Sequence, residues 1–341
     1  MAQHPATTAA EQPTWQEPSQ RGRLRPRIAP ERHAVSARKV STEQRDALAR
    51  LRSVKGFVFD LDGTLVLGDN LNKSVKPLPG AVELTQQLQQ QGVPFVILTN
   101  GTTRTPEQYA TMLSDVGFAI SSDRLVLTPS AVAAEYFVRR RFQRVMVLGG
   151  EGVSAPLEAA GIRVSRPAKT TEGRELGTVR DPVDAVFVGW YREFSIDDLE
   201  AACQAISEGA RLFTGSLAPY FATAHGKALG TSRAICAMIS SLTGKRAKVL
   251  GKPSLEALRC AGRRLGIDPG ELAVVGDDPA LEVPMAHRGG SLAIAVHTGV
   301  GSITAFAALP PTLQPHLSLA GVSELMECAL WATPFPIGTK L

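Results

Sequence analysis

The sequence predicts an α/β protein built on a doubly wound parallel sheet, with a second α/β unit of similar style inserted in the first. From residue 56 onward, short apolar runs alternate with amphipathic segments, the pattern of a parallel sheet covered by helices. The chain has 341 residues, of which 44% are hydrophobic and 20% are charged. This length and composition predict about two globular units plus tails and exclude a wholly disordered chain.

Eight apolar runs are the expected strands, and helices are expected between them. The runs are 57–61, 93–98, 144–149, 184–189, 210–214, 246–251, 271–276 and 292–296. Thr105 followed by Pro106 predicts the start of one helix, and Gly117 predicts its end. Ser195 and Asp198 form the pattern of a capping box at the start of another helix.

The N-terminal segment has a different composition. Residues 1–50 hold nine Arg or Lys and five Asp or Glu, so most of the net charge of +5 lies there. The segment lacks apolar periodicity, and we expect a disordered arm with a short helix over 42–52. The run from Arg21 to Arg27 leaves open a weak nucleic-acid contact or a targeting signal, but a solvated tail is favoured. The rest of the chain predicts no basic surface for nucleic acid.

Other features exclude further classes of protein. No apolar run reaches about 18 residues, and the N-terminus lacks the apolar stretch of a secretory signal, so we expect a cytoplasmic protein without a membrane span. The four cysteines have no paired spacing, which disfavours a zinc site or a disulfide framework. At the C-terminus we expect one helix over 322–331 and then a tail over 331–341.

Polar side chains follow four of the expected strands. They are Asp60, Asp62, Thr99, Asn100, Lys252, Asp277, Asp278 and Glu282. In an open parallel sheet, ligands bind outside the carboxyl ends of the strands, so residues at these ends converge even when they are far apart in sequence. The sequence therefore predicts one site that contains all of them.

The residue types in this set indicate a metal ion and a phosphate group. Asp60, Asp62 and Asp277 would raise one another's pKa at close range unless a cation neutralised them. All the candidate ligands are oxygens, which favours a hard ion, Mg²⁺ above zinc. Lys252 as a fixed positive charge, Thr99 as a hydroxyl donor and the turn that begins at Asn100 suit an anion with several oxygens, and phosphate fits best. We therefore assign Thr99, Asn100 and Lys252 to phosphate binding.

The same residues predict a reaction. Asp60 ends its strand and would point rigidly into the crevice, so we assign it as the nucleophile that forms an aspartyl-phosphate. Asp62 lies two residues further on and is the candidate general acid, and then the general base for water. Lys252 and Mg²⁺ would offset the charge on the phosphoryl oxygens.

Together these motifs resemble the haloacid dehalogenase superfamily of phosphohydrolases. The matching motifs are DLDGT at 60–64, a strand ending in Thr99, GKP at 251–253 and GDD at 276–278, in the family's order. The resemblance covers about residues 56–300. It implies a Rossmann-like core with Asp60 as nucleophile, Asp62 as acid, base and backbone-carbonyl metal ligand, and Asp277 as an Mg²⁺ ligand. Thr99 and Lys252 would contact the phosphoryl group.

The placement of the insert resembles class IIA of this superfamily, in which a C2-type α/β cap is inserted after the second motif. The resemblance implies a core over 51–122 and 246–330 and a cap over 123–245. Members of the class dephosphorylate nucleotides, pyridoxal phosphate, phosphoglycolate, glycerol phosphate or sugar phosphates, so a small phosphorylated metabolite is the expected substrate. Relatives often pair through their caps, which makes a homodimer possible.

Some positions depart from the family pattern. Glu282 stands where a second aspartate is usual, so either Asp278 or Glu282 could supply the remaining carboxylate behind the metal ligands. Ala218 replaces an acidic residue of the cap. Trp190 and Tyr191 either line the pocket or pack in the core. The departures leave open a catalytically weak protein that binds a phosphorylated ligand in a regulatory role.

Overall fold

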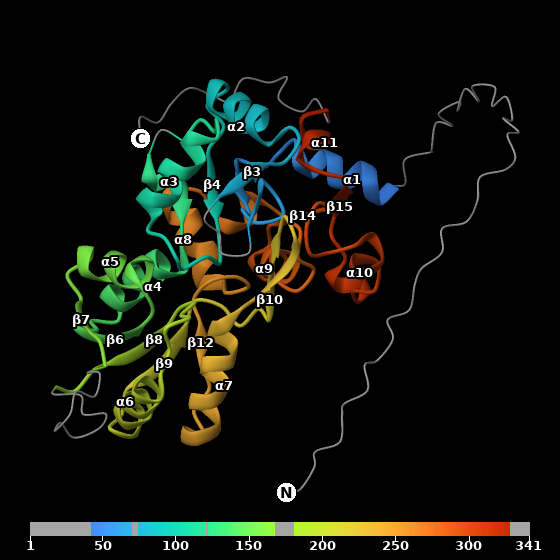
Figure 1. Cartoon of the computed structure of the whole chain (residues 1–341). Helices are drawn as coiled ribbons and strands as arrows, with labels where there is room; N and C mark the ends of the chain where they lie inside the picture. The colour runs from blue at the N-terminus through green and yellow to red at the C-terminus, as the bar shows by residue number, and fades with distance from the viewer. Residues whose placement is uncertain (1–41, 70–73, 121, 168–180, 328–341) are drawn as a thin grey trace, which may run out of the picture. The chain divides into compact units, whose positions relative to one another are not determined.

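The computed structural model describes residues 42–69, 74–120, 122–167 and 181–327 (Figure 1). Within the expected arm, α1 (Thr42–Leu51) forms the short helix predicted there. The rest of the arm, including the run from Arg21 to Arg27, and the expected tail lie outside the described residues. The expected C-terminal helix is present as α11 (Val322–Glu327).

The first sheet has six parallel strands in the order β15-β14-β13-β1-β4-β5. Their bounds are β1 (Gly56–Phe59), β4 (Phe95–Leu98), β5 (Val126–Leu127), β13 (Leu272–Gly276), β14 (Leu292–Val296) and β15 (Leu317–Leu319). The chain runs outward from β1 to β5 and returns to β13 on the other side of β1. The order therefore reverses between β1 and β13, the place where open α/β sheets bind ligands.

Helices cover both faces of this sheet. Phe57 and Phe59 of β1 belong to a core shared with α1, α2 (Ala81–Gln90), α3 (Pro106–Asp115) and α11. Val58 points to the opposite core, shared with α4 (Pro129–Arg139), α8 (Leu255–Leu265) and α9 (Glu282–Gly289). Burial on both faces explains why the strands are continuous apolar runs. This is the predicted doubly wound sheet. No helix in the described ranges has the length and apolar character to cross a bilayer.

A second parallel sheet has the order β12-β9-β8-β6-β7. Its strands are β6 (Arg144–Leu148), β7 (Arg163–Ser165), β8 (Ala185–Val188), β9 (Arg211–Thr214) and β12 (Lys248–Val249). Helices α4 and α5 (Glu151–Ala159) pack on one face, and α6 (Ile196–Ser207) and α7 (Thr231–Thr243) pack on the other. All five strands lie between β5 and α8 in the chain, so this second α/β unit is inserted in the first, as predicted.

A small mixed sheet, β11-β10-β2-β3, was not predicted. Its strands are β2 (Val66–Gly68), β3 (Val75–Pro77), β10 (Tyr220–Thr223) and β11 (Gly226–Leu229). Strand β10 pairs in parallel with β2 through Thr223 and Gly68, and the Ala224 amide donates to the Gly68 carbonyl at 2.7 Å. The sheet thus joins the segment after β1 to a hairpin of the inserted unit.

Candidate active site

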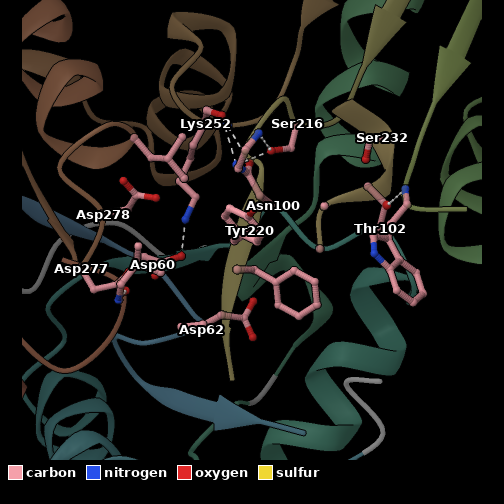
Figure 2. A pocket seen from close by; sticks show the side chains of 18 of the residues that line it. Asp60, Asp62, Asn100, Thr102, Ser216, Tyr220, Ser232, Lys252, Asp277 and Asp278 are labelled. Atoms are coloured by element: carbon pink, nitrogen blue, oxygen red, sulfur yellow. Dashed lines mark hydrogen bonds and ion pairs between the residues drawn. The ribbon is translucent and has the colours of Figure 1, made fainter. Parts of the chain in front are cut away.

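A cavity lies beyond the carboxyl ends of β1 and β13, at the point where the strand order reverses (Figure 2). Seven of the eight polar residues predicted from the sequence line it. They are Asp60, Asp62, Asn100, Lys252, Asp277, Asp278 and Glu282. The eighth, Thr99, is fully buried and contacts Asp62. The structure therefore brings the whole predicted set together from segments up to 222 residues apart, between Asp60 and Glu282.

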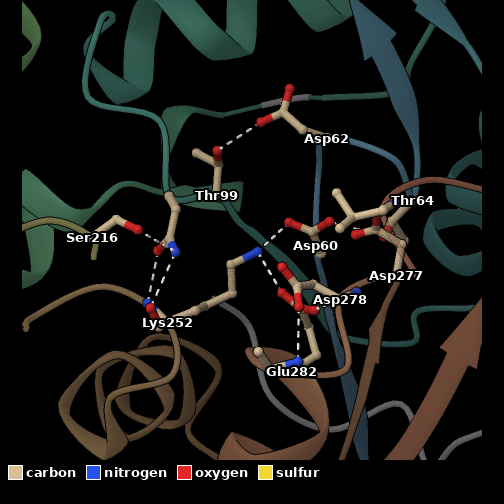
Figure 3. A network of polar contacts seen from close by, with 12 residues as sticks. Asp60, Asp62, Thr64, Thr99, Ser216, Lys252, Asp277, Asp278 and Glu282 are labelled. Atoms are coloured by element: carbon tan, nitrogen blue, oxygen red, sulfur yellow. Dashed lines mark hydrogen bonds and ion pairs between the residues drawn. The ribbon is translucent and has the colours of Figure 1, made fainter. Parts of the chain in front are cut away.

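Lys252 lies at the centre of the polar network (Figure 3). Its side chain is almost fully buried, and its Nζ forms ion pairs with Asp60 and with Oε1 of Glu282, the latter at 2.8 Å. Burial by itself would lower the pKa of Lys252, but the two carboxylates raise the pKa above its ordinary value. The amine is therefore a fixed positive charge in a water-poor site.

Asp60 is held rigidly at the end of β1. Its backbone amide donates to the Val275 carbonyl of β13 at 2.9 Å, which continues the strand ladder. The Thr64 hydroxyl donates to Oδ2 of Asp60 at 2.9 Å, and Lys252 pairs with Oδ1. Both carboxylate oxygens thus have a fixed partner. Thr64 was not singled out from the sequence, although it is the last residue of the DLDGT motif.

Asp62 has the electrostatic setting of a general acid. The Thr99 hydroxyl donates to its Oδ2 at 3.3 Å, and the Gly101 amide donates to the Thr99 hydroxyl at 2.9 Å. Burial, and then the negative charge of Asp60, raise the pKa of Asp62 to about 7. A carboxyl group with a pKa near neutrality can both give up and take back a proton at physiological pH.

Asp277 extends the acidic cluster from the end of β13. It is buried, and its Oδ2 accepts the Val300 amide at 2.5 Å, while the Gly301 amide donates to its carbonyl at 2.9 Å. Burial, and then the charges of Asp60 and Glu282, raise the pKa of Asp277 to about 9. The sequence did not predict that the loop after β14 takes part in the site. This loop contributes backbone amides, and every residue type except proline has one, so the residue types give no indication of the contact.

The donor set fits a magnesium ion. Asp60 and Asp277 lie close together in Figure 3, and their mutual repulsion is what a divalent cation relieves. Within the described residues, no three His, Cys, Asp or Glu side chains already form a metal cage. Mg²⁺ does not require such a cage, because it keeps several waters and is often bound through one or two carboxylates together with substrate phosphate.

Glu282 and Asp278 occupy different environments behind Asp277. Glu282 is buried, pairs with Lys252, and accepts the Asp278 amide on Oε2 at 3.1 Å. Burial raises the pKa of Glu282 to about 7. The Asp278 side chain instead accepts the Ala280 amide at 2.8 Å. Of the two carboxylates that the sequence left as alternatives, Glu282 is the one in contact with Lys252.

Asn100 has its side-chain amide engaged by the protein. Its Oδ1 accepts the Lys252 amide at 2.8 Å, and its Nδ2 donates to the Lys252 carbonyl at 3.1 Å and to the Ser216 hydroxyl at 3.2 Å. The side chain therefore braces the loop that carries Lys252 and contacts the inserted unit through Ser216. This geometry favours a positioning role over the phosphate contact expected for this side chain. Ser216 was not predicted as a site residue.

The inserted unit supplies the opposite wall of the cavity. Trp190 lines it, whereas its neighbour Tyr191 does not. The Trp190 amide donates to the Thr102 hydroxyl at 2.7 Å, and its indole Nε1 donates to the Leu229 carbonyl at 3.0 Å. These two bonds fix the ring at the cavity wall. Ala218, the position that departs from the family pattern, also lines the cavity.

Gly63 allows the backbone to approach Asp277. Its φ of 93° is disfavoured for other residues, and a Cβ there would lie 2.4 Å from Oδ2 of Asp277. We expect Gly63→Ala to lower the free energy of unfolding by about 1–3 kcal/mol and to impair catalysis, because the carboxylate must move. Urea unfolding and phosphate release measure the two effects.

Gly92→Ala is the matched control, because Gly92 also has a positive φ of 66° but has open space around it. We expect Gly92→Ala to cost about 1 kcal/mol through its backbone alone and to leave catalysis unchanged. Equal losses of stability and activity in the two variants would show that contact with Asp277 is not the reason for the glycine at position 63.

Fold and site together define a class of protein: an α/β phosphatase with an acidic and lysine-containing site at the switch point of its sheet and an inserted α/β unit. A family model described as haloacid dehalogenase-like hydrolase matches residues 57–163, and a second HAD-hydrolase-like model matches residues 249–325. The chain belongs to the haloacid dehalogenase-like hydrolases, as a phosphatase of class IIA.

The chain is similar to several characterised proteins. It is 30% identical to chronophin from Rattus norvegicus over 81% of this chain and 88% of that protein. It is 28% identical to the 5'-nucleotidase YutF from Bacillus subtilis over 73% of this chain and 90% of that protein. The structure of a glycerol phosphate phosphatase from Mycobacterium tuberculosis in complex with magnesium matches with a TM-score of 0.64 and 25% identity, covering 77% of this chain and 73% of that one.

Proposed function

We propose that the protein is a Mg²⁺-dependent phosphomonoesterase that hydrolyses a small phosphorylated metabolite through an aspartyl-phosphate on Asp60. The observation that carries the proposal is the buried pairing of Asp60 with Lys252, beside Asp277 and within reach of Asp62. The relatives support the substrate class, since their names include a 5'-nucleotidase, an acid sugar phosphatase and phosphoglycolate phosphatases.

In the first step, a carboxylate oxygen of Asp60 attacks phosphorus, and the bond from phosphorus to the ester oxygen breaks. Asp62 gives its proton to that ester oxygen, which leaves as an alcohol. Lys252 stays charged and offsets the negative charge on the phosphoryl oxygens. Mg²⁺, held by Asp60, Asp277 and the Asp62 carbonyl, would supply further positive charge to the phosphoryl group.

In the second step, Asp62 takes a proton from water as the water oxygen attacks phosphorus. The bond between phosphorus and Asp60 breaks, which releases inorganic phosphate and restores the Asp60 carboxylate. Thr99 holds the Asp62 carboxyl in place during both proton transfers. We assign Asn100 the role of positioning Lys252. Glu282 supplies the carboxylate that lies behind the metal ligands and pairs with Lys252.

Asp62→Asn tests the role of the general acid. We expect kcat/KM to fall by about 10²–10⁴-fold with phenyl phosphate, whose leaving group needs a proton. The loss is expected to be smaller with 4-nitrophenyl phosphate, because nitrophenolate leaves without protonation. Steady-state assays with both esters measure the two losses. Equal losses for the two esters would rule out proton donation by Asp62 to the leaving oxygen.

Removal of the metal tests the cofactor and the alternative role. We expect EDTA to abolish phosphate release and added Mg²⁺ to restore it, because Asp60 and Asp277 cannot accept a phosphate dianion between them without a cation. Turnover that survives chelation would contradict the assignment. Thermal stabilisation by phosphorylated metabolites without any phosphate release would instead favour a regulatory ligand-binding protein.

The domain limits are also a proposal. Strand β5 pairs with β4 of the first sheet, and β12 pairs with β9 of the second, which supports moving the expected limits at 122 and 246 to just after Leu127 and Val249. A homodimer formed through the inserted unit and a cytoplasmic location stay predictions.

A further inference from the structure

We propose that the substrate is a phosphate monoester whose leaving group is uncharged and presents an apolar or aromatic face, so that the phosphate is its only anionic group. The inference rests on the proposed function and names the substrate class of the same cavity. It follows from how charged and uncharged side chains are distributed between the two walls of the cavity (Figure 2).

Within the part of the chain that the structure describes, all the charged side chains at the cavity belong to the wall from the first unit. Among the described residues that line the cavity, the charged side chains are Asp60, Asp62, Lys252, Asp277, Asp278 and Glu282. Five are carboxylates, and the one amine already pairs with Asp60 and Glu282. When the substrate binds, its phosphate group takes up the positive charge of Lys252 and of the metal ion at this wall. Among the described residues, this wall offers a second anionic group on the substrate no further cation.

The described residues that form the wall from the inserted unit are all uncharged. Its members in the described ranges include Trp190, Ser216, Ala218, Tyr220, Phe221 and Ser232. In Figure 2, Ser216 and Ser232 lie on the side away from Asp277 and Asp278. Aromatic rings offer apolar faces, and hydroxyl groups can pair with neutral donors and acceptors. This wall therefore suits an uncharged leaving group.

The cations near the cavity act on the protein's own groups. The Arg104 guanidinium lies 5.9 Å from the centre of the Tyr109 ring. Burial raises the pKa of Asp278, and the charge of Lys227 offsets only a small part of that rise. The Arg192 guanidinium lies 5.8 Å from the centre of the Trp190 ring. None of the three lines the cavity. A carboxylate on the leaving group would lose its hydration shell against the described residues of this wall, which offer it no charged partner, and that loss is strongly unfavourable.

A matched pair of esters tests the inference on the Mg²⁺-loaded protein: phenyl phosphate and 4-carboxyphenyl phosphate. We expect kcat/KM to be at least about tenfold higher for phenyl phosphate. The carboxylated phenol is the better leaving group, so intrinsic reactivity opposes this result. Equal values, or a preference for the carboxylated ester, would overturn the inference while leaving the proposed hydrolysis intact.

Binding separates the inference from turnover. Benzylphosphonate and 4-carboxybenzylphosphonate have no ester bond to hydrolyse, and calorimetry on the Mg²⁺-loaded protein gives their dissociation constants. We expect at least about tenfold tighter binding of the uncharged compound. Absence of phosphate release from every ester would defeat the proposed function, whereas equal binding of the two phosphonates would defeat the inference about the cavity.

Ala218→Lys places a cation on the uncharged wall. We expect it to shift the ratio of the two kcat/KM values by about tenfold or more toward the carboxylated ester. Leu217→Lys is the matched control, because Leu217 is 36% exposed and does not line the cavity. We expect the ratio to stay at the wild-type value in this control. An unchanged ratio in Ala218→Lys, with thermal unfolding showing a folded protein, would contradict the inference.

Discussion

Asp60→Asn is expected to lower kcat for phenyl phosphate by about 10⁴-fold or more. The amide oxygen is a poor nucleophile, so the covalent step has no acceptor for the phosphoryl group. Asparagine has nearly the same size as aspartate, so a side chain of similar shape still lies beside Thr64 and Lys252. Single-turnover phosphate release in Mg²⁺ measures the effect.

The matched control is Asp115→Asn, an exposed aspartate at the end of α3. It removes the same charge from the chain far from the reaction, and kcat should stay at the wild-type value. Thermal unfolding of both variants establishes that they fold. If Asp60→Asn retains a large part of wild-type turnover, the nucleophile is another group and the proposed mechanism is wrong.

Lys252→Met is expected to impair both turnover and folding stability. It removes the one amine that the described residues place at the cavity wall, so we expect kcat/KM to fall by about 10²–10³-fold. It also leaves Asp60 and Glu282 buried without their cation, which is expected to lower the free energy of unfolding by about 3–5 kcal/mol. Lys76→Met, at an exposed position in β3, is the control for loss of a lysine.

The loss of stability in Lys252→Met should depend on pH. Burial raises the pKa of Glu282 to about 7 even though Lys252 lowers it, so removal of Lys252 raises it further. A carboxyl group with a raised pKa holds a proton in the folded state that it releases on unfolding. The free energy of unfolding therefore falls as the pH rises above the ordinary pKa of the group, which is its pKa in the unfolded chain. We expect urea unfolding to show a larger deficit relative to wild type at pH 8 than at pH 5. A deficit that is independent of pH would contradict the pairing.

The eight apolar runs predicted β1, β4, β13 and β14 of the first sheet and β6, β8, β9 and β12 of the second. Strands such as β1 and β13 are buried on both faces, and this burial produces a continuous apolar signal that one sequence can reveal. The strands that were not predicted contain two to four residues, among them β5 and the pair β2 and β10. Such short segments carry no measurable periodicity, and β2 and β10 pair across about 150 residues of chain.

The polar side chains of the site were predictable because they follow strands that end at one edge of a sheet. The contributions of the Val300 amide and of Ser216 were not, since they depend on how separate loops meet. Asn100 was predicted from its place after a strand and lines the cavity, but only the structure reveals that its side chain pairs with the backbone of Lys252. Partners of this kind are set by tertiary packing and not by local residue pattern.

Chemical trapping of the covalent intermediate tests most directly whether Asp60 is the residue that becomes phosphorylated. Borohydride reduces an acyl phosphate to an alcohol, so an aspartyl-phosphate becomes homoserine, which mass spectrometry of peptides can locate. With Mg²⁺ and phenyl phosphate present, we expect homoserine at position 60, and none when the metal or the ester is left out. Continued phosphate release with reduction at no residue, or at a residue other than Asp60, would contradict the mechanism.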